Sequence, residues 1–205
     1  MQLKNYYWYF KSALPKKICN EIVKLGESTK NSQASVGGSP DPRLMGKEKL
    51  KDLKTQRDSN ITWLAEKWIY KNIHPYINLA NKNAEWNFQW DFSEACQFTK
   101  YKKGQYYDWH YDSWDQPYSN INNKNFFQKI RKLSVTISLS DPREYKGGVL
   151  EFQLPGKKPI IRKCKEILPK GSIVVFPSHI WHRVSPVTKG ERKSLVVWNL
   201  GWPFK

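Results

Sequence analysis

The sequence predicts a mainly β fold, a sandwich or jelly roll, whose N-terminal helices pack against one sheet. Two observations lead to this class. Before about residue 85 the apolar residues recur at the spacing of amphipathic helices, whereas from about residue 86 onward the hydrophobic period falls to two. The later runs are short and are bounded by Gly, Pro, Asn or Asp, which is typical of antiparallel strands.

Two helices are expected in the N-terminal part. Residues 15–26, bracketed by a proline and a glycine, carry apolar side chains at helical spacing. A longer helix is expected to start at a cap near Asp58 or Ser59 and to continue until His74-Pro75 disrupts it. The buried stripe of this second helix would comprise Ile61, Leu64, Ala65, Trp68, Ile69 and Ile73.

The sharpest strand prediction covers residues 133–139. Apolar side chains alternate there with serine and threonine, so one face of the strand should be buried, and Asp141-Pro142 then ends the run. Further strands are predicted at residues 149–154, 160–163, 172–176, 181–184 and 194–200.

Length and composition restrict the class of protein further. The 205 residues suit one domain, with residues 1–85 as a helical support region and residues 86–205 as the β core. An apolar content of 39% excludes disordered and collagen-like chains. No apolar run approaches the roughly 18 residues that span a bilayer, and the first residues do not resemble a signal peptide. Together with three scattered cysteines, these features predict a reducing, cytoplasmic location.

The net charge is the one unbalanced quantity. The chain has 35 Lys plus Arg against 18 Asp plus Glu, a formal charge of +17. Such a charge suits an acidic partner, including nucleic acid. Because no block of five like charges occurs, lysines that only solubilise the surface explain it equally well.

A metal site is predicted from the pattern His110-x-Asp112. In an extended segment, alternation places this imidazole and carboxylate on one face, and Asp108 shares their parity, either lining the entrance or standing as a solvated carboxylate. Two histidines and one carboxylate are the ligands of Fe(II) in non-haem oxygenases. His182, on a later strand, would supply the second imidazole. His179 is the alternative, although it follows a turn and would face elsewhere.

A cosubstrate site is expected beside the metal. Three protein ligands leave three positions open, so a 2-oxo acid can bind through two of them and dioxygen through the last. The far carboxylate of such an acid requires a cation. Arg192 follows the turn-rich residues 185–190, and a returning antiparallel strand would carry its planar guanidinium into the same cavity.

Taken together, these motifs resemble a known family. The chain contains His110-x-Asp112, His182 and Gly190-x-Arg192, supported by Tyr101-x-x-Gly104-x-x-Tyr107-x-x-His110, Gly147-Gly148-Val-Leu150-Glu-Phe152 and Pro177-Ser-His-Ile-Trp-His182-Arg-Val. From about residue 96 to 198 it resembles the Fe(II)/2-oxoglutarate-dependent dioxygenases, specifically their prolyl 4-hydroxylase-like branch. The resemblance implies a double-stranded β-helix, a cupin-like jelly roll, preceded by helices.

The resemblance also implies roles for individual residues. His110, Asp112 and His182 would hold iron, Arg192 would grip the 5-carboxylate of 2-oxoglutarate, and Tyr101 would hydrogen-bond the same molecule. Ser194 either assists Arg192 or is an ordinary strand serine. Relatives often offer a second tyrosine from the strand at residues 135–139, where this chain has threonine and serines, so the remaining cosubstrate contacts are left open.

The implied reaction is oxidative decarboxylation of 2-oxoglutarate by O2, with release of succinate and CO2 and hydroxylation of a C–H bond. Fe(II) would be the metal, and ascorbate would support activity. The expected substrate is a prolyl or other side chain of a protein or peptide. The alternatives are a dioxygenase that modifies nucleic acid, consistent with the +17 charge, and a non-catalytic jelly-roll binding module.

Two features near the metal motif bear on substrate binding. A polyproline-type peptide would suit an aromatic groove near Tyr106, Trp109, Tyr111 and Trp114. Residues 113–129, rich in asparagine and aromatic side chains, either form a flap that covers the substrate or a loop that its own aromatics hold in place.

Overall fold

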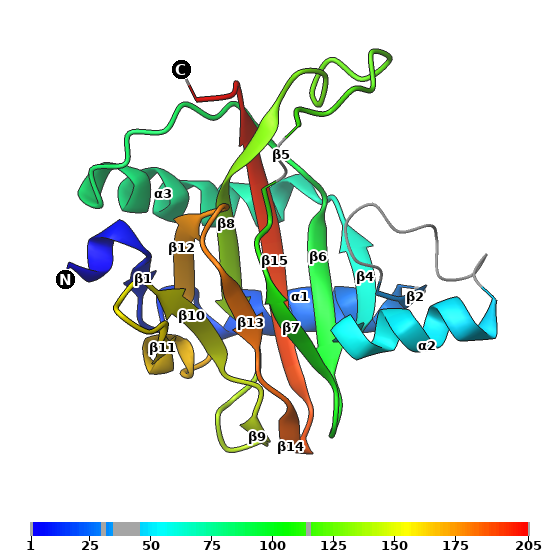
Figure 1. Cartoon of the computed structure of the whole chain (residues 1–205). Coiled ribbons are helices and arrows are strands. Elements are labelled where there is room, and N and C mark those ends of the chain that lie inside the picture. Colours follow the sequence, from blue (N-terminus) through cyan, green and yellow to red (C-terminus); the bar gives the residue numbers. More distant parts are fainter. Residues whose placement is uncertain (1, 30–31, 35–45, 114–115, 205) are drawn as a thin grey trace.

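Two antiparallel sheets face each other at the centre of the molecule (Figure 1). The computed structural model describes residues 2–29, 32–34, 46–113 and 116–204. The larger sheet has the order β1 (Trp8–Phe10), β12 (Ile173–Pro177), β8 (Ile130–Ser138), β15 (Arg192–Gly201), β6 (Cys96–Tyr101), β4 (Asn60–Leu64) and β2 (Ser32–Gln33), with β5 (Phe92–Ser93) paired to β15. The smaller sheet has the order β11 (Ile160–Lys163), β10 (Leu150–Leu154), β13 (His182–Val184), β7 (Tyr106–His110) and β3 (Arg57–Asp58).

This arrangement is the predicted jelly roll with N-terminal helices. A separate pair, β9 (Tyr145–Gly147) and β14 (Val187–Gly190), lies at one end of the two sheets. The strands predicted from residue 133 onward are all present, with ends shifted by a few residues. No helix in the described residues is long and apolar enough to cross a bilayer, and all three cysteines are buried and unpaired.

The two faces of strand β8 line two different buried regions of the molecule. Leu133, Val135 and Ile137 enter the core between the larger sheet and the helices. Ser134 and Thr136 point the opposite way, into the space between the two sheets, and they are buried as well. The prediction of one buried face was therefore incomplete, because the polar face of this strand lines an internal cavity.

Two helices cover the outer face of the larger sheet (Figure 1). Helix α1 (Lys16–Ser28) matches the first predicted helix, and α3 (Lys67–Asn83) contains the second half of the other. Their apolar stripes are buried against β8, β12 and β15, which is the standard way for an amphipathic helix to stabilise a sheet. A third helix, α2 (Lys47–Gln56), was not predicted, and it leads directly into β3.

The predicted helix start near residue 58 was wrong. Residues 57–58 and 60–64 form β3 and β4, and α3 begins only at Lys67. Ile61, Thr62 and Trp63 are β-branched or aromatic, and β4 pairs with β6 along its whole length. The apolar spacing at Ile61 and Leu64 therefore fits a buried strand as well as a helix.

The proline in α3 also does not end that helix as predicted. Pro75 lies inside α3, which continues to Asn83. Proline cannot donate a backbone hydrogen bond to the preceding turn. The helix tolerates this loss because Ile77 and Ala80, beyond the proline, are fully buried in the core and hold the last turns against the sheet.

A close approach between α1 and the sheet gives a stability prediction. Gly26 lies in α1, where a Cβ atom would overlap the ring of Phe98 on β6. Replacement by alanine usually favours a helix, but here Gly26→Ala should destabilise the fold by about 1–3 kcal/mol through overpacking. Chemical denaturation measures this difference. Gly46→Ala, where the new Cβ meets no atom within 4 Å, is the control, and equal effects of the two changes would contradict the packing argument.

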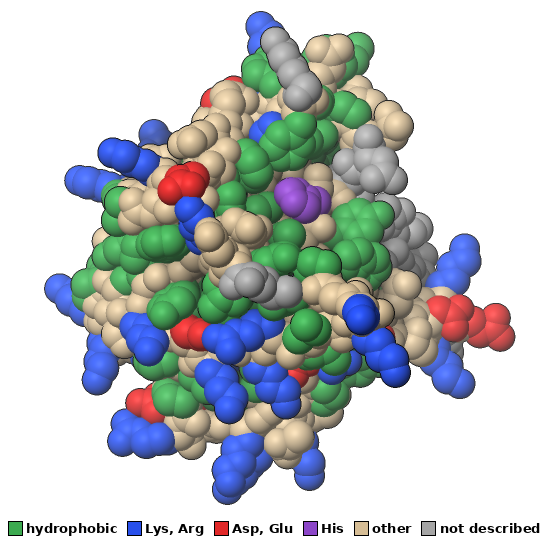
Figure 2. Space-filling model, turned by 60° about the vertical axis from the view of Figure 1, so that its left-hand side comes forward, with side chains coloured by type: hydrophobic (Ala, Val, Ile, Leu, Met, Phe, Trp, Pro, Cys, Tyr) green, Lys and Arg blue, Asp and Glu red, His purple; other side chains and the backbone are tan. Residues whose placement is uncertain are grey.

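Figure 2 shows Lys and Arg at the outline and across the lower half of one face of the molecule, while hydrophobic side chains surround a histidine above them. This distribution is typical of a solubilising surface.

Candidate active site

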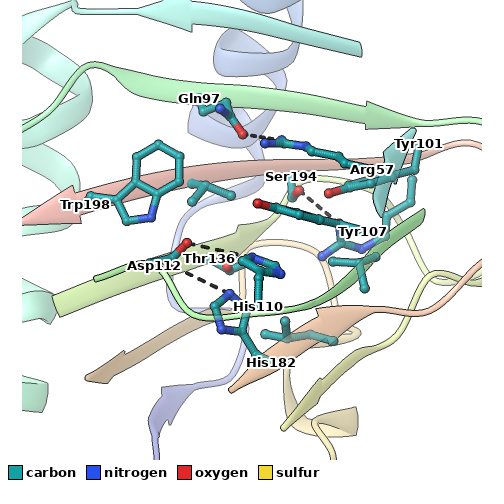
Figure 3. A pocket seen from close by; sticks show the side chains of 14 residues that line it. Arg57, Gln97, Tyr101, Tyr107, His110, Asp112, Thr136, His182, Ser194 and Trp198 are labelled. Atoms are coloured by element: carbon teal, nitrogen blue, oxygen red, sulfur yellow. Dashed lines mark hydrogen bonds and ion pairs between the residues drawn. The ribbon is translucent and has the colours of Figure 1, made fainter. Parts of the chain in front are cut away.

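The pairing of β7 with β13 brings the predicted metal ligands together. His110 at the end of β7 is directly opposite His182 at the start of β13. Asp112 follows β7, and its backbone N–H donates to the carbonyl of Ser178 at 2.8 Å. His110 Nε2 lies 3.8 Å from Asp112 Oδ1, and His182 Nε2 lies 3.5 Å from Asp112 Oδ2. The three ligand atoms all lie within 4.8 Å of one another (Figure 3).

Backbone carbonyls fix the orientation of both imidazoles. His110 Nδ1 is 2.7 Å from the carbonyl oxygen of Asp108, and His182 Nδ1 is 2.8 Å from that of Ile180. A carbonyl oxygen only accepts hydrogen bonds, so each Nδ1 must carry the proton. In the neutral ring the lone pair is then on Nε2, the atom nearest Asp112, and this is the form of histidine that binds a metal.

Asp112 is held by two serines. Ser134 Oγ donates to Asp112 Oδ2 at 2.6 Å and lies 2.9 Å from Ser178 Oγ. Burial raises the pKa of the Asp112 carboxyl, but the two imidazoles, Arg131 and the Ser134 hydrogen bond outweigh burial and hold that pKa below its ordinary value. The carboxylate is therefore ionised, and its Oδ1, which does not accept from Ser134, is directed toward His110.

The ring of Tyr107 covers the imidazole of His110. The two rings stack with centroids 3.5 Å apart, and the guanidinium of Arg57 lies 4.4 Å from the centre of the other face of Tyr107. Burial, followed by the charge of His182, lowers the pKa of His110 to about 3. Burial raises the pKa of Tyr107 to about 12. Both rings are neutral at physiological pH.

A β-bulge explains why Tyr107 and His110 share one face. Along the pairing, His110 is opposite His182, whereas Tyr107 is opposite Val184, so β7 contains one extra residue between the two pairs. Simple alternation, which placed Asp108 on the side of His110, fails at this point. The side chain of Asp108 is exposed, as the prediction of a solvated carboxylate allowed.

Arg192 lies at the far end of the same cavity. Its side chain is 3% exposed, and its Nη1 donates to Ser194 Oγ at 3.0 Å. Tyr101 is its register partner on β6, with the ring centre 5.5 Å from the guanidinium carbon. Gly148 has a φ of +57°, and a Cβ there would lie 2.8 Å from Arg192 Cδ, so glycine at this position leaves room for the arginine.

The cavity between the sheets contains all six side chains to which the family resemblance gives a role in binding iron or 2-oxoglutarate. It also contains side chains to which no role was given. The lining residues are Arg57, Gln97, Tyr101, Tyr107, His110, Asp112, Thr136, Leu150, His182, Val184, Arg192, Ser194, Val196 and Trp198.

Arg57 and Trp198 line the cavity, but no role was predicted for either of them. Trp198 shares the parity of Arg192 and Ser194 on β15, and this signal was available. Arg57 had no such signal, because its segment was expected to start a helix. Its Nη2 donates to Gln97 Oε1 at 2.6 Å (Figure 3). Thr136 lines the cavity at the level where relatives often carry a second tyrosine.

His179 does not join this group. Its side chain is exposed, and its ring lies 6.4 Å from that of Phe204, centre to centre. Of the predicted aromatic groove, Tyr111 is 40% exposed and packs edge-on against Trp181, with ring centres 5.3 Å apart. Trp109 stacks under Arg183, and Tyr106 bonds to a backbone carbonyl of α2. Trp114 lies outside the described residues.

The segment after the metal motif is anchored at its base. Tyr118 donates to Glu94 Oε1 at 3.0 Å, and Phe126 packs edge-on against Phe92 and Tyr118. Glu94 is in turn paired with Arg131 at 2.6 Å. These are the contacts expected of a loop held by its aromatics, and a flap that covers the substrate stays a prediction.

The donor set fits a ferrous ion. Two imidazoles and one ionised carboxylate converge from one side of the cavity, and the Nδ1 atom of each imidazole is already bonded to a backbone carbonyl. Two histidines and one carboxylate inside a jelly roll are characteristic of non-haem iron oxygenases.

The family model for the 2OG-Fe(II) oxygenase superfamily matches residues 96–199. The chain belongs to this superfamily. The matched segment runs from β6 to β15 and contains His110, Asp112, His182 and Arg192.

Curated relatives match a shorter part of the chain. A PKHD-type hydroxylase from Pseudoalteromonas atlantica is 33% identical over 103 residues, which is 50% of this chain and 41% of that protein. A PKHD-type hydroxylase from Hyphomonas neptunium is 46% identical over 66 residues, which is 32% of this chain and 27% of that protein. The match thus spans less than half the length of these relatives.

Solved structures support the fold over nearly the whole chain. A viral collagen prolyl hydroxylase from Paramecium bursaria Chlorella virus-1, in complex with 2OG, gives a TM-score of 0.64 at 20% identity and covers 96% of each chain. A Pseudomonas putida prolyl-4-hydroxylase gives 0.63 at 19% identity, covering 96% of this chain and 94% of that one. A Trichoplax adhaerens prolyl hydroxylase, in complex with a hypoxia inducible factor peptide, gives 0.62 at 16% identity, covering 97% and 85%.

The serine that holds Asp112 gives a test of the metal site. Ser134→Ala removes the hydroxyl donor to Asp112 Oδ2, and it should weaken binding of Fe(II), or of Mn(II) as a stable substitute, by about 10–100-fold. Titration calorimetry measures this affinity. Ser138→Ala makes the same chemical change on the same face of β8 and should leave metal affinity unchanged. Equal affinities in the two variants would contradict the orienting role of Ser134.

The lowered pKa of His110 predicts acid sensitivity of the metal-free protein. The folded state keeps His110 neutral down to about pH 3, whereas in the unfolded chain the pKa is near the ordinary 6.5. Below pH 6.5 the unfolded state therefore binds more protons, and stability should fall by about 1 kcal/mol for each further pH unit. Denaturation at pH 7 and pH 5 in the presence of a chelator should show a smaller loss in His110→Gln. Parallel losses in the two proteins would refute the assignment.

Proposed function

We propose that this protein is an Fe(II)- and 2-oxoglutarate-dependent dioxygenase that hydroxylates a C–H bond of a protein or peptide, with a prolyl residue as the leading candidate. The observation that carries the proposal is one cavity that contains both the His110, Asp112 and His182 cluster and the buried guanidinium of Arg192. Membership of the 2OG-Fe(II) oxygenase superfamily supports the reaction type.

The metal and the cosubstrate would bind at opposite ends of the cavity. His110, Asp112 and His182 would hold Fe(II), while Arg192, ordered by Ser194 and covered by Tyr101, would bind the far carboxylate of 2-oxoglutarate. Bound iron would supply the coupled chemistry, in which O2 and 2-oxoglutarate give succinate, CO2 and a hydroxylated product. Ascorbate would keep the iron reduced.

The remaining wall residues would protect this chemistry from bulk water. Leu150 and Val184 are buried apolar side chains of the smaller sheet, and Tyr107 closes the cavity over His110. Exclusion of water by these side chains would strengthen the pairing of Arg192 with a carboxylate and limit side reactions.

A peptide substrate is favoured by the surface near the metal ligands. Tyr111 and Trp181, the immediate chain neighbours of two ligands, form an exposed aromatic pair. Such pairs suit proline rings and polyproline-type segments. The structural neighbours include prolyl hydroxylases, and one of them holds a peptide.

The +17 charge keeps nucleic acid as a second candidate substrate. The two candidates differ in their response to salt. Binding of nucleic acid should weaken steeply as ionic strength rises, whereas binding of an uncharged proline peptide should change little. The cytoplasmic location and the division at residue 85 stay predictions.

Loss of a ligand should abolish the reaction. His110→Ala and Asp112→Ala should each reduce succinate formation from 2-oxoglutarate, assayed with Fe(II), ascorbate and a proline peptide, to the background rate. His179→Ala is the matched control, because His179 lies outside the cavity, and it should keep the rate of the unchanged protein. Full activity in either ligand variant would refute the assignment of that residue as an iron ligand.

A further inference from the structure

A buried ion pair lies behind the metal ligand Asp112. Arg131 on β8 contacts Glu94 through two nitrogens, with Nε 2.6 Å from Oε1 and Nη2 2.7 Å from Oε2. The side chains of Arg131 and Glu94 are only 12% and 9% exposed. The guanidinium also lies over the indole of Trp198, with its carbon 3.9 Å from the centre of the ring. The two bonds and this stacking fix the plane of the guanidinium.

One end of the ion pair reaches the metal site. Arg131 Nη1 lies 3.5 Å from the backbone carbonyl oxygen of Asp112. Ser134, three residues further along β8, holds Oδ2 of the same aspartate. Strand β8 therefore contacts Asp112 both at its backbone and at its carboxylate, and a displacement of Arg131 would act on the position of this ligand.

The other end of the ion pair reaches residues 116–129. The hydroxyl of Tyr118 donates to Glu94 Oε1 at 3.0 Å, the same oxygen that accepts from Arg131 Nε. The backbone N–H of Tyr118 donates to the carbonyl of Lys129 at 3.0 Å, which joins the two ends of the segment. Figure 1 shows the segment projecting past the end of β8. One side-chain hydrogen bond thus ties its base to the buried ion pair.

Stability alone does not explain this ion pair. Burial removes water from two charges, and apolar side chains of similar volume often stabilise a fold equally well or better. The pair provides what apolar side chains cannot provide, because its hydrogen bonds have fixed directions. They connect a hydroxyl of one segment to the backbone of a metal ligand in another.

We propose that the chain of contacts Tyr118–Glu94–Arg131 couples residues 116–129 to Asp112, so that metal binding and order in this segment stabilise each other. The inference rests on the proposed function, because it requires a metal at Asp112, and it assigns three positioning residues to that site. Such a coupling is reciprocal. Whatever the segment adds to the affinity for the metal, the metal adds to the stability of the segment.

The affinity for a metal tests one direction of the coupling. Tyr118→Phe removes the hydroxyl but keeps the ring that packs against Phe126. It should weaken binding of Mn(II) to the full chain, measured by titration calorimetry, by about 2- to 30-fold. Tyr76→Phe is the matched control, because it removes a hydroxyl that donates to the carbonyl of Ala13, away from the cavity. Equal affinities in the two variants would overturn the inference.

Hydrogen–deuterium exchange, followed by mass spectrometry, tests the reverse direction. Mn(II) should slow exchange of the backbone amides of residues 116–129 in the unchanged protein and in Tyr76→Phe. The slowing should be smaller in Tyr118→Phe, because the link from the segment to Glu94 is lost. A purely structural role of Tyr118 would leave the effect of Mn(II) unchanged. That result, or an absence of slowing in the unchanged protein, would contradict the coupling.

A double-mutant cycle tests the route through Glu94. If Tyr118 acts through this carboxylate, Tyr118→Phe should cause little further loss of Mn(II) affinity in a Glu94→Gln background. An undiminished loss would refute the route. Should Glu94→Gln fail to fold, the Tyr118→Phe measurements still decide the inference. If the unchanged protein does not bind Mn(II), the proposed iron site itself is refuted, whereas binding that is equal in all variants refutes only the coupling.

Discussion

The hydrogen-bonded pairing of β7 with β13 is the constraint on which the site depends. It places His182 directly opposite His110, and the bond from Asp112 N–H to the carbonyl of Ser178, the residue after β12, fixes the third ligand at the turn that leads into β13. The ligand positions are therefore set by backbone geometry. Side-chain entropy lost on metal binding is reduced, because both imidazoles are already oriented by the carbonyls of Asp108 and Ile180.

Burial of polar groups between the two sheets is energetically unfavourable, and apolar packing on the outer face of the larger sheet offsets it. One face of β8 and β15 is packed against helices with apolar side chains. The other face carries Ser134, Ser194 and Arg192, whose hydrogen bonds are completed within the cavity. Because the outer face supplies the hydrophobic burial, the inner face is free to carry polar groups that orient a metal and an anion.

Much of the fold and most of the site were accessible from the sequence. Period-two alternation located the later strands, and the His110-x-Asp112 pattern with His182 and Arg192 named four residues that meet in one cavity. The errors have local causes. Residues 60–64 satisfied both helical and extended patterns until pairing with β6 selected the strand. One extra residue in β7 placed Tyr107, and not Asp108, on the side of His110.

The sequence by itself determined which side chains have the chemistry for a ferrous ion and a dicarboxylic acid, because those residue types and their order are written in the chain. Only the tertiary structure decided which further residues join them. Arg57 reaches the cavity because β3 adds to the edge of the smaller sheet beside β7. Tyr107 reaches it because the bulge in β7 turns its side chain to the same face as His110. Both depend on contacts between segments distant in sequence, and no local pattern of side chains encodes such contacts.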